Sequence, residues 1–258
     1  TGFPEEAGSP GAWGTNINLP LLPGTGDEGL HRLYDGLISH ILEDFKPELI
    51  INSAGQDNHF SDPLASMAVT AQGYARLADK LQADIAVLEG GYSVESALPY
   101  VNTGIILAMA GMDYSKVLEP DMSQLRKQDP RCNKRVDQLI EQVGDLYFNR
   151  ERTKKELLQK CNGVWQRKKH IYYDEEGIRE QQLETVRYCS ICDGYFTIQT
   201  AAEDTRFGDQ SAFIVCLPRD ICPNCRQRAY DEALREKKTG RWQYVFVQQI
   251  VDGFIETI

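Results

Sequence analysis

The feature that most constrains the fold of this 258-residue sequence is an apolar run that ends in a polar loop, residues 49–63. The run Leu49–Ile51 follows Pro47, and its length and composition predict a buried strand of a parallel sheet. The loop after it carries three ionisable side chains, Asp57, His59 and Asp62. Because ligands of open α/β sheets bind beyond the carboxyl ends of the strands, we expect a functional site at this loop.

A second apolar run, residues 85–88, ends in the same way, in the sequence Glu-Gly-Gly-Tyr of residues 89–92. If the two strands are neighbours, their ends present a carboxylate and a tyrosine hydroxyl to one cleft. Residues with helical spacing of apolar side chains flank both strands, at about 27–45, 70–81 and 94–110. This β-α-β-α alternation predicts an α/β fold, a three-layer α/β/α sandwich around a parallel sheet.

Four motifs occur in a fixed order along this part of the chain. They are Asn-Leu-Pro-Leu-Leu-Pro-Gly-Thr-Gly-Asp (18–27), Ser-Ala-Gly-x-Asp-x-His-x-x-Asp-Pro-Leu (53–64), Val-Thr-Ala-x-Gly-Tyr (69–74) and Leu-Glu-Gly-Gly-Tyr (88–92). Together they resemble the histone deacetylase superfamily, which includes bacterial acetylpolyamine and acetoin-utilisation relatives. The resemblance covers roughly residues 1–115 and implies the arginase/deacetylase-like fold.

The resemblance implies zinc-dependent hydrolysis of an acylated amine. Asp57 matches a zinc-binding aspartate, and Tyr92 matches the tyrosine that hydrogen-bonds the carbonyl oxygen of the scissile amide. Gly90 and Gly91 match positions where the backbone approaches the substrate. Without the resemblance, an aspartate at a strand end is more often a cap or a turn residue.

Other residues of the same motifs are predicted to support the site. His59 lies outside the histidine positions of the family, so we interpret it as a loop residue near the metal site. Asp62 precedes Pro63 and is expected to fix the loop or cap the next element. Two residues depart from the family pattern: Gln56 replaces a common apolar residue and is expected to alter the pocket wall, and Ser93 replaces a common asparagine.

The family's paired catalytic histidines and its other two zinc ligands lie upstream of the motif that Thr1 and Gly2 match. We therefore expect the chain to act as the C-terminal portion of a deacetylase domain, whose N-terminal half is part of the same or a separate polypeptide. One catalytic zinc would be shared with that half. A sheet without its earlier strands would expose an apolar edge.

Seven cysteines occur, and four of them form two Cys-x-x-Cys pairs separated by 29 residues. Four thiolates at this spacing predict a structural zinc held as a zinc ribbon, with ligands Cys189, Cys192, Cys222 and Cys225. A redox pair is the alternative, but no thioredoxin-like βαβ pattern surrounds them. The remaining cysteines have no metal-ligand spacing: Cys132, Cys161 and Cys216.

The pattern divides the chain into three predicted parts. Residues 1–120 form the deacetylase-like part, 121–181 a helical linker with a helix at about 151–169, and 182–258 the zinc-ribbon domain. Eight Lys and Arg face only two Glu between residues 150 and 169. This excess of positive charge indicates either a solvated helix face or a contact for an acidic partner.

Composition narrows the function classes. The net charge of −10 argues against a nucleic-acid partner, and no apolar run approaches the ~20 residues that span a membrane. We therefore expect a soluble, cytoplasmic chain. The first hypothesis is an amidohydrolase acting on substrates such as acetyl-lysine or acetylpolyamine. The alternative is a non-catalytic zinc-ribbon module for binding or assembly on a degenerate deacetylase scaffold, which would dock the missing half or form a homo-oligomer.

Overall fold

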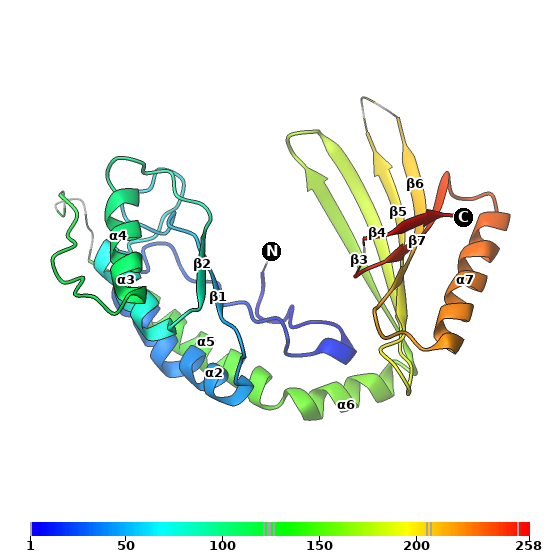
Figure 1. The fold of residues 1–258 in the computed structure, drawn as a ribbon, viewed down its shortest axis with the longest axis horizontal. Coiled ribbons are helices and arrows are strands. Elements are labelled where there is room, and N and C mark those ends of the chain that lie inside the picture. The colour runs from blue at the N-terminus through cyan, green and yellow to red at the C-terminus, as the bar shows by residue number, and fades with distance from the viewer. Residues whose placement is uncertain are drawn as a thin grey trace. The chain divides into compact units, whose positions relative to one another are not determined.

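The computed structural model describes residues 2–120, 122, 125, 127–204, 206, 208–251 and 253–258. The chain forms two compact units, each of which is continuous in space but not in sequence (Figure 1). Unit 1 comprises Thr1–Ala7 and Asn16–Arg150, and unit 2 comprises Gly8–Thr15 and Glu151–Ile258.

Unit 1 alternates strands and helices as the sequence predicts. Its elements are α1 (Asp27–Leu33), the π-helical η2 (Tyr34–Ile38), α2 (Ser39–Phe45), β1 (Ile51–Ala54), α3 (Ala71–Leu81), β2 (Ile85–Leu88), α4 (Leu98–Met109) and α5 (Pro130–Phe148). Thr70 caps α3, since its side chain accepts a hydrogen bond from the Gly73 backbone N–H. The α/β class is therefore confirmed.

Strands β1 and β2 pair in parallel, from Ile51 opposite Ile85 to Ala54 opposite Leu88. Helices α3 and α4 pack against each other and against one face of this pair, where small residues allow close approach (Figure 1). On the other face the apolar side chains of Ile51, Ile85 and Val87 are exposed. Within the described residues, helices thus cover one face of the sheet, and the third layer of the predicted sandwich is not formed.

Helix α5 belongs to the core of unit 1, so the prediction that a linker begins at residue 121 is wrong for this helix. Its buried side chains Val136, Leu139 and Val143 pack against Leu33 and Leu37 of α1 and η2. The apolar periodicity predicts this helix correctly, but its apolar stripe is buried against α1 and η2, so the helix is part of the core and not a linker. Four positions of the predicted linker, 121, 123, 124 and 126, lie outside the described residues.

Unit 2 is a mixed sheet with one helix across it. Its elements are η1 (Pro10–Ala12), α6 (Arg150–Lys160), β3 (Val164–Tyr173), β4 (Ile178–Arg187), β5 (Tyr195–Glu203), β6 (Gln210–Leu217), α7 (Pro223–Lys238), β7 (Tyr244–Gln249) and β8 (Ile255–Thr257). The strands lie in the order β3-β4-β5-β6-β7-β8, and only β6 and β7 of the described ladder are parallel. Their crossover is α7, which packs on β5, β6 and β7. None of the described helices combines the length and apolarity required to cross a membrane.

The predicted helix at 151–169 is wrong beyond Lys160, and the sheet begins well before the predicted boundary at residue 182. Asn162 and Gly163 adopt positive φ angles of 47° and 80°, which reverse the chain after α6. The following residues then pair with β4 along the whole length of β3. Helix α6 has no buried residue, as a solvated helix face requires.

His31 on α1 is buried, and neither of its ring nitrogens has a hydrogen-bond partner. Burial, reinforced by Arg76 and Lys80, lowers the pKa of His31 below its ordinary value. The unfolded chain therefore takes up a proton at a pH where the folded chain does not. The stability of unit 1 is full above the unfolded pKa of about 6.5 and falls as the pH drops toward the folded pKa.

We expect His31→Leu to make unit 1 less sensitive to acid. Between pH 7.5 and 5.5 the melting temperature should fall further for the unsubstituted chain than for the variant, by a few degrees, since 1 kcal/mol shifts Tm by about 2–4 °C. The exposed His40, replaced by Leu, is the matched control and should keep the original pH profile. Identical pH profiles for His31→Leu and the unsubstituted chain would contradict the prediction.

Candidate functional site

The loops that follow β1 and β2 lie side by side at one edge of the sheet. The Gln56 backbone N–H donates to the Gly90 carbonyl at 2.5 Å, which continues the parallel pairing beyond the strands. Nearer the strands, the hydroxyl of Ser53 in β1 donates to the carboxylate of Glu89, the residue after β2, at 2.7 Å. The parallel register therefore brings the two predicted site loops together, although 30 residues separate their hydrogen-bonded positions Asp62 and Tyr92.

Asp57 and Tyr92 converge on the space beside Gly90. A Cβ atom placed on Gly90 would lie 2.6 Å from Asp57 Oδ2 and 3.5 Å from the Tyr92 hydroxyl oxygen. The two oxygens are therefore no farther apart than the sum of these distances. Tyr92 is 52% exposed, so the space between them is open to solvent. This arrangement offers a carboxylate ligand and a hydrogen-bond donor to one small molecule.

Gly91 and Gln56 lie on the inner side of the same loops. A Cβ on Gly91 would meet Leu98 at 2.8 Å and the Gln56 side chain at 3.1 Å, so this glycine is required for packing. Gln56 is 1% exposed, and its amide donates a hydrogen bond to Asn102 of α4. Gln56 is therefore part of the interior and does not form the wall of an open pocket, contrary to expectation. A substrate contact by Gly91 stays a prediction.

Asp62 fixes the loop, as its place before Pro63 predicts. Its Oδ2 accepts the Tyr92 backbone N–H at 2.8 Å, and its Oδ1 accepts the Leu64 N–H at 2.9 Å. Burial raises the pKa of Asp62, but the backbone N–H groups of Leu64 and Tyr92 outweigh it and lower the pKa below its ordinary value. The carboxylate thus stays charged while it holds the backbone of the tyrosine.

His59 is completely buried and pairs with a residue that the sequence analysis missed. Its Nε2 lies 3.0 Å from Glu119 Oε1, and its Nδ1 lies 2.9 Å from the Ser61 hydroxyl. Glu119 follows His59 by 60 residues, beyond the motifs, and no local pattern connects them. His59 is therefore a loop residue, as predicted, but one with a specific buried carboxylate partner.

A cavity of about 500 Å³ lies behind β1, between the strand and helices α1, α3 and α4. Its wall is mostly apolar, with Leu19, Leu30, Met67 and Leu77 among its residues. Gly55 and Asn58, which stand on either side of Asp57 in the sequence, also line it. The core of unit 1 is thus incompletely filled directly beside the candidate site.

A catalytic zinc would require more ligands than the Asp57 loop provides. Among the described residues, one group of three or more His, Cys, Asp or Glu side chains could hold a metal, and it consists of four cysteines. Asp57 does not belong to it. One carboxylate at the end of a strand suits a single zinc ligand, but it does not make a site without two more.

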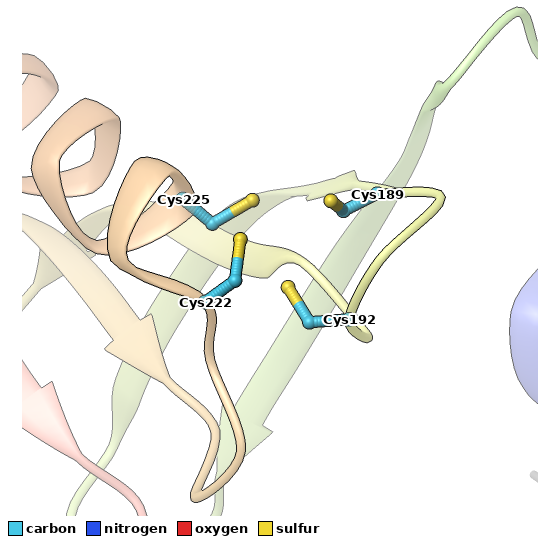
Figure 2. Close-up of side chains that lie close together, drawn as sticks. All are labelled: Cys189, Cys192, Cys222 and Cys225. Atoms are coloured by element: carbon cyan, nitrogen blue, oxygen red, sulfur yellow. The ribbon is translucent and has the colours of Figure 1, made fainter.

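The four predicted cysteines come together in unit 2. Cys189 and Cys192 lie in the loop after β4, and Cys222 and Cys225 lie at the start of α7, with their sulfur atoms turned toward one another (Figure 2). All four sulfur atoms lie within 4.8 Å of one another, which suits the closed tetrahedral set of a structural zinc. The other cysteines lie outside this cluster: Cys132, Cys161 and Cys216.

The backbone of the cysteine loop stabilises the negatively charged thiolate form of Cys189. Backbone N–H groups of Ile191 and Cys192 point at Cys189 and lower the pKa of its thiol to about 6. Thiolates are the form that binds zinc. Gly194, with φ of 81°, ends the loop where a Cβ would collide with the Arg187 carbonyl.

Beside the cluster, a partly buried ion pair attaches α7 to the sheet. Arg187 at the end of β4 pairs with Glu232 of α7, whose other oxygen accepts the Tyr195 hydroxyl at 2.9 Å. Burial and the bond to Glu232 raise the pKa of Tyr195 to about 12, so it remains a donor. Both ligand pairs are therefore carried by elements that are fixed to each other.

Comparisons with known proteins agree with the geometry of unit 1. The histone deacetylase domain model matches residues 1–108. A probable deacetylase of Archaeoglobus fulgidus is 52% identical over 130 residues, which are 47% of this chain and 36% of the relative. A histone deacetylase-like amidohydrolase of Pseudomonas aeruginosa is 29% identical over 155 residues, 54% of this chain and 40% of the relative.

The chain thus spans little more than a third of the length of these relatives. Among solved structures, the crystal structure of the HDA15 HD domain matches with a TM-score of 0.49 and 24% identity, over 62% of this chain and 43% of that one. The family model includes both loops that carry Asp57 and Tyr92. Residues 1–108 of this chain are therefore similar to the histone deacetylase domain, over the segment that carries both site loops.

Proposed function

We propose that this chain provides the Asp57 and Tyr92 part of a zinc-dependent amidohydrolase that removes acyl groups from acylated amines. The carrying observation is the convergence of the Asp57 carboxylate and the Tyr92 hydroxyl beside Gly90. Asp57 would hold the zinc with two ligands from the rest of the site, and the ion would supply Lewis-acid activation of the amide and of a water. Tyr92 would donate its hydrogen bond to the oxyanion that forms from the amide carbonyl.

The rest of the deacetylase domain is the proposed partner of unit 1. The uncovered sheet face exposes Ile51, Ile85 and Val87, and the cavity behind β1 is lined by further apolar side chains. Burying such surface against a second part of the domain is favourable by about 25 cal/mol per Å². That part would supply the two other zinc ligands and the general base, from the same or a separate polypeptide.

The proposed substrates are acylated amines, with acetyl-lysine and acetylpolyamine as the representatives to assay. Both present a small acyl amide on a flexible chain. Gly90 leaves room for the acyl carbonyl between the metal ligand and the hydroxyl donor, since no side chain occupies that position. The related amidohydrolase of Pseudomonas aeruginosa supports the reaction class for this chain.

In the assembled enzyme, in which this chain is present together with the rest of the catalytic domain, we expect Tyr92→Phe to lower kcat about 10²–10³-fold. The loss follows from removing one donor to the oxyanion while the aromatic ring stays. Turnover of acetyl-lysine peptides and acetylated polyamines measures it, with thermal melting to show that the fold is kept.

Tyr172→Phe is the matched control, because Tyr172 is an exposed tyrosine of β3 in unit 2. It should leave kcat unchanged. Near-normal turnover by Tyr92→Phe would overturn the assignment of the tyrosine. An assembled enzyme that hydrolyses no acylated amine, yet keeps its zinc, would instead favour the alternative function as a binding or assembly module.

We further propose that the four cysteines of unit 2 hold a structural zinc. A closed four-thiolate site stabilises a fold and has no open position for a substrate. Its position between the β4–β5 loop and the start of α7 means that one ion would connect the sheet to its covering helix.

Elemental analysis of the chain alone should give about one zinc per chain, as a single four-cysteine site requires. We expect Cys222→Ser to remove this zinc and to lower the melting temperature of unit 2, because metal binding contributes folding free energy. Cys161→Ser replaces a half-buried thiol outside the cluster and should change neither quantity. Full zinc content in Cys222→Ser would show that the metal is bound elsewhere.

A further inference from the structure

A line of hydrogen-bonded side chains, buried at its Glu119 end and partly buried at its Ser93 end, leads from the segment after α4 to the residue after Tyr92. Glu119 Oε1 lies 3.0 Å from His59 Nε2, and His59 Nδ1 lies 2.9 Å from the Ser61 hydroxyl. The Ser61 hydroxyl in turn lies 2.9 Å from the hydroxyl of Ser93. Four polar side chains from three separate segments of the sequence are thus joined in one line.

The tautomer of His59 follows from one backbone group. The Ser61 N–H donates to His59 Nδ1 at 3.2 Å, so this nitrogen is an acceptor and the ring proton lies on Nε2. Nε2–H therefore donates to Glu119. The Ser61 hydroxyl lies beside the same nitrogen, and in its pair with Ser93 either hydroxyl can be the donor. Each group therefore has a partner on both sides in the line from Glu119 to Ser61.

One end of the chain is firmly anchored. Glu119 is 5% exposed, and its Oε1 also accepts the backbone N–H of Ala71, the first residue of α3, at 2.5 Å. A carboxylate is stabilised at this position by the positive end of the helix dipole. His59 is 0% exposed, and both of its ring nitrogens have partners. The anchor is therefore part of the core.

The other end of this line of side chains, Ser93, belongs to the loop that carries Tyr92. The Tyr92 hydroxyl has no hydrogen-bond partner among the described residues, so its place depends on how the backbone is held. Asp62 holds the Tyr92 N–H, and the Gln56 N–H holds the Gly90 carbonyl. Ser93 provides the attachment on the C-terminal side, and its carbonyl also accepts the Ala97 N–H at 3.0 Å.

We propose that His59 is a positioning residue, which fixes the Tyr92 hydroxyl beside Asp57 through Ser61 and Ser93. It touches neither metal nor substrate. The inference rests on the proposed role of Tyr92 in hydrolysis. It assigns a reason for the buried imidazole in this loop. His59 holds the Ser61 hydroxyl against the Glu119 anchor, and Ser61 in turn joins the Asp57 loop to the Tyr92 loop at Ser93.

A measurement without catalysis tests the geometry. With 3-fluorotyrosine at position 92 of the chain, we expect Ser61→Ala and Ser93→Ala to shift or broaden the same ¹⁹F resonance. Substitutions at the serines avoid opening a cavity at the fully buried His59. Ser66→Ala, an exposed serine of the same loop, is the matched control and should leave the resonance unchanged. An unchanged resonance in both test variants would overturn the proposal.

Kinetics of the assembled enzyme test the consequence. We expect Ser93→Ala to lower kcat about 10-fold with KM within about 2-fold, since small misplacements of a reacting group are costly. In a Tyr92→Phe background the same substitution should have no further effect on kcat, because the hydroxyl that it positions is already absent. Additive losses would show that Ser93 acts independently of the hydroxyl and would contradict the inference.

The two experiments separate failure of the inference from failure of the proposed function. If Tyr92→Phe turns over normally, the proposed catalytic role is wrong, whereas the ¹⁹F comparison still decides whether the chain positions the tyrosine. If Tyr92→Phe is impaired and the resonance is indifferent to Ser61 and Ser93, the function stands and the positioning role is wrong.

Discussion

The parallel pairing of β1 with β2 is the constraint on which the candidate site depends. Parallel strands end at the same edge of a sheet. Asp57, which follows β1, and Tyr92, which follows β2, are therefore brought together by the backbone pairing alone. The hydrogen bond from Gln56 N–H to the Gly90 carbonyl extends this pairing into the loops. Everything else at the site refines a position that the backbone register has already set.

The sequence was sufficient for the parts of the molecule that depend on local pattern. The strand Leu49–Ile51 predicted β1 within a few residues, and the glycine-rich loop before Tyr92 predicted the second site segment. Cys-x-x-Cys spacing predicted the grouping of four thiols. Each pair is set by local sequence, and only the contact between the two pairs depends on the tertiary fold. In these cases the motif and its structural context are contained in the same short stretch.

The sequence failed where the deciding contact is distant. The basic residues of β3 suited a solvated helix equally well, and only the ladder with β4 makes them a strand; Arg167, for example, pairs with Glu184 across it. The amphipathic stripe of α5 correctly predicted a helix but not the surface that buries it. Glu119 lies outside every motif, so its contact with His59 has no signal in a single sequence.

Gly90 separates the chemistry of the site from its fold. Its backbone does not adopt a positive φ, so the backbone conformation does not demand glycine there. The glycine is needed because a Cβ at this position would come too close to the Asp57 carboxylate. A side chain of a single carbon atom would stand 2.6 Å from the Asp57 carboxylate and 3.5 Å from the Tyr92 hydroxyl, so it would occupy the space between them. One substitution of this kind would block the proposed reaction at its metal ligand while the parallel pairing of β1 with β2 stays in place.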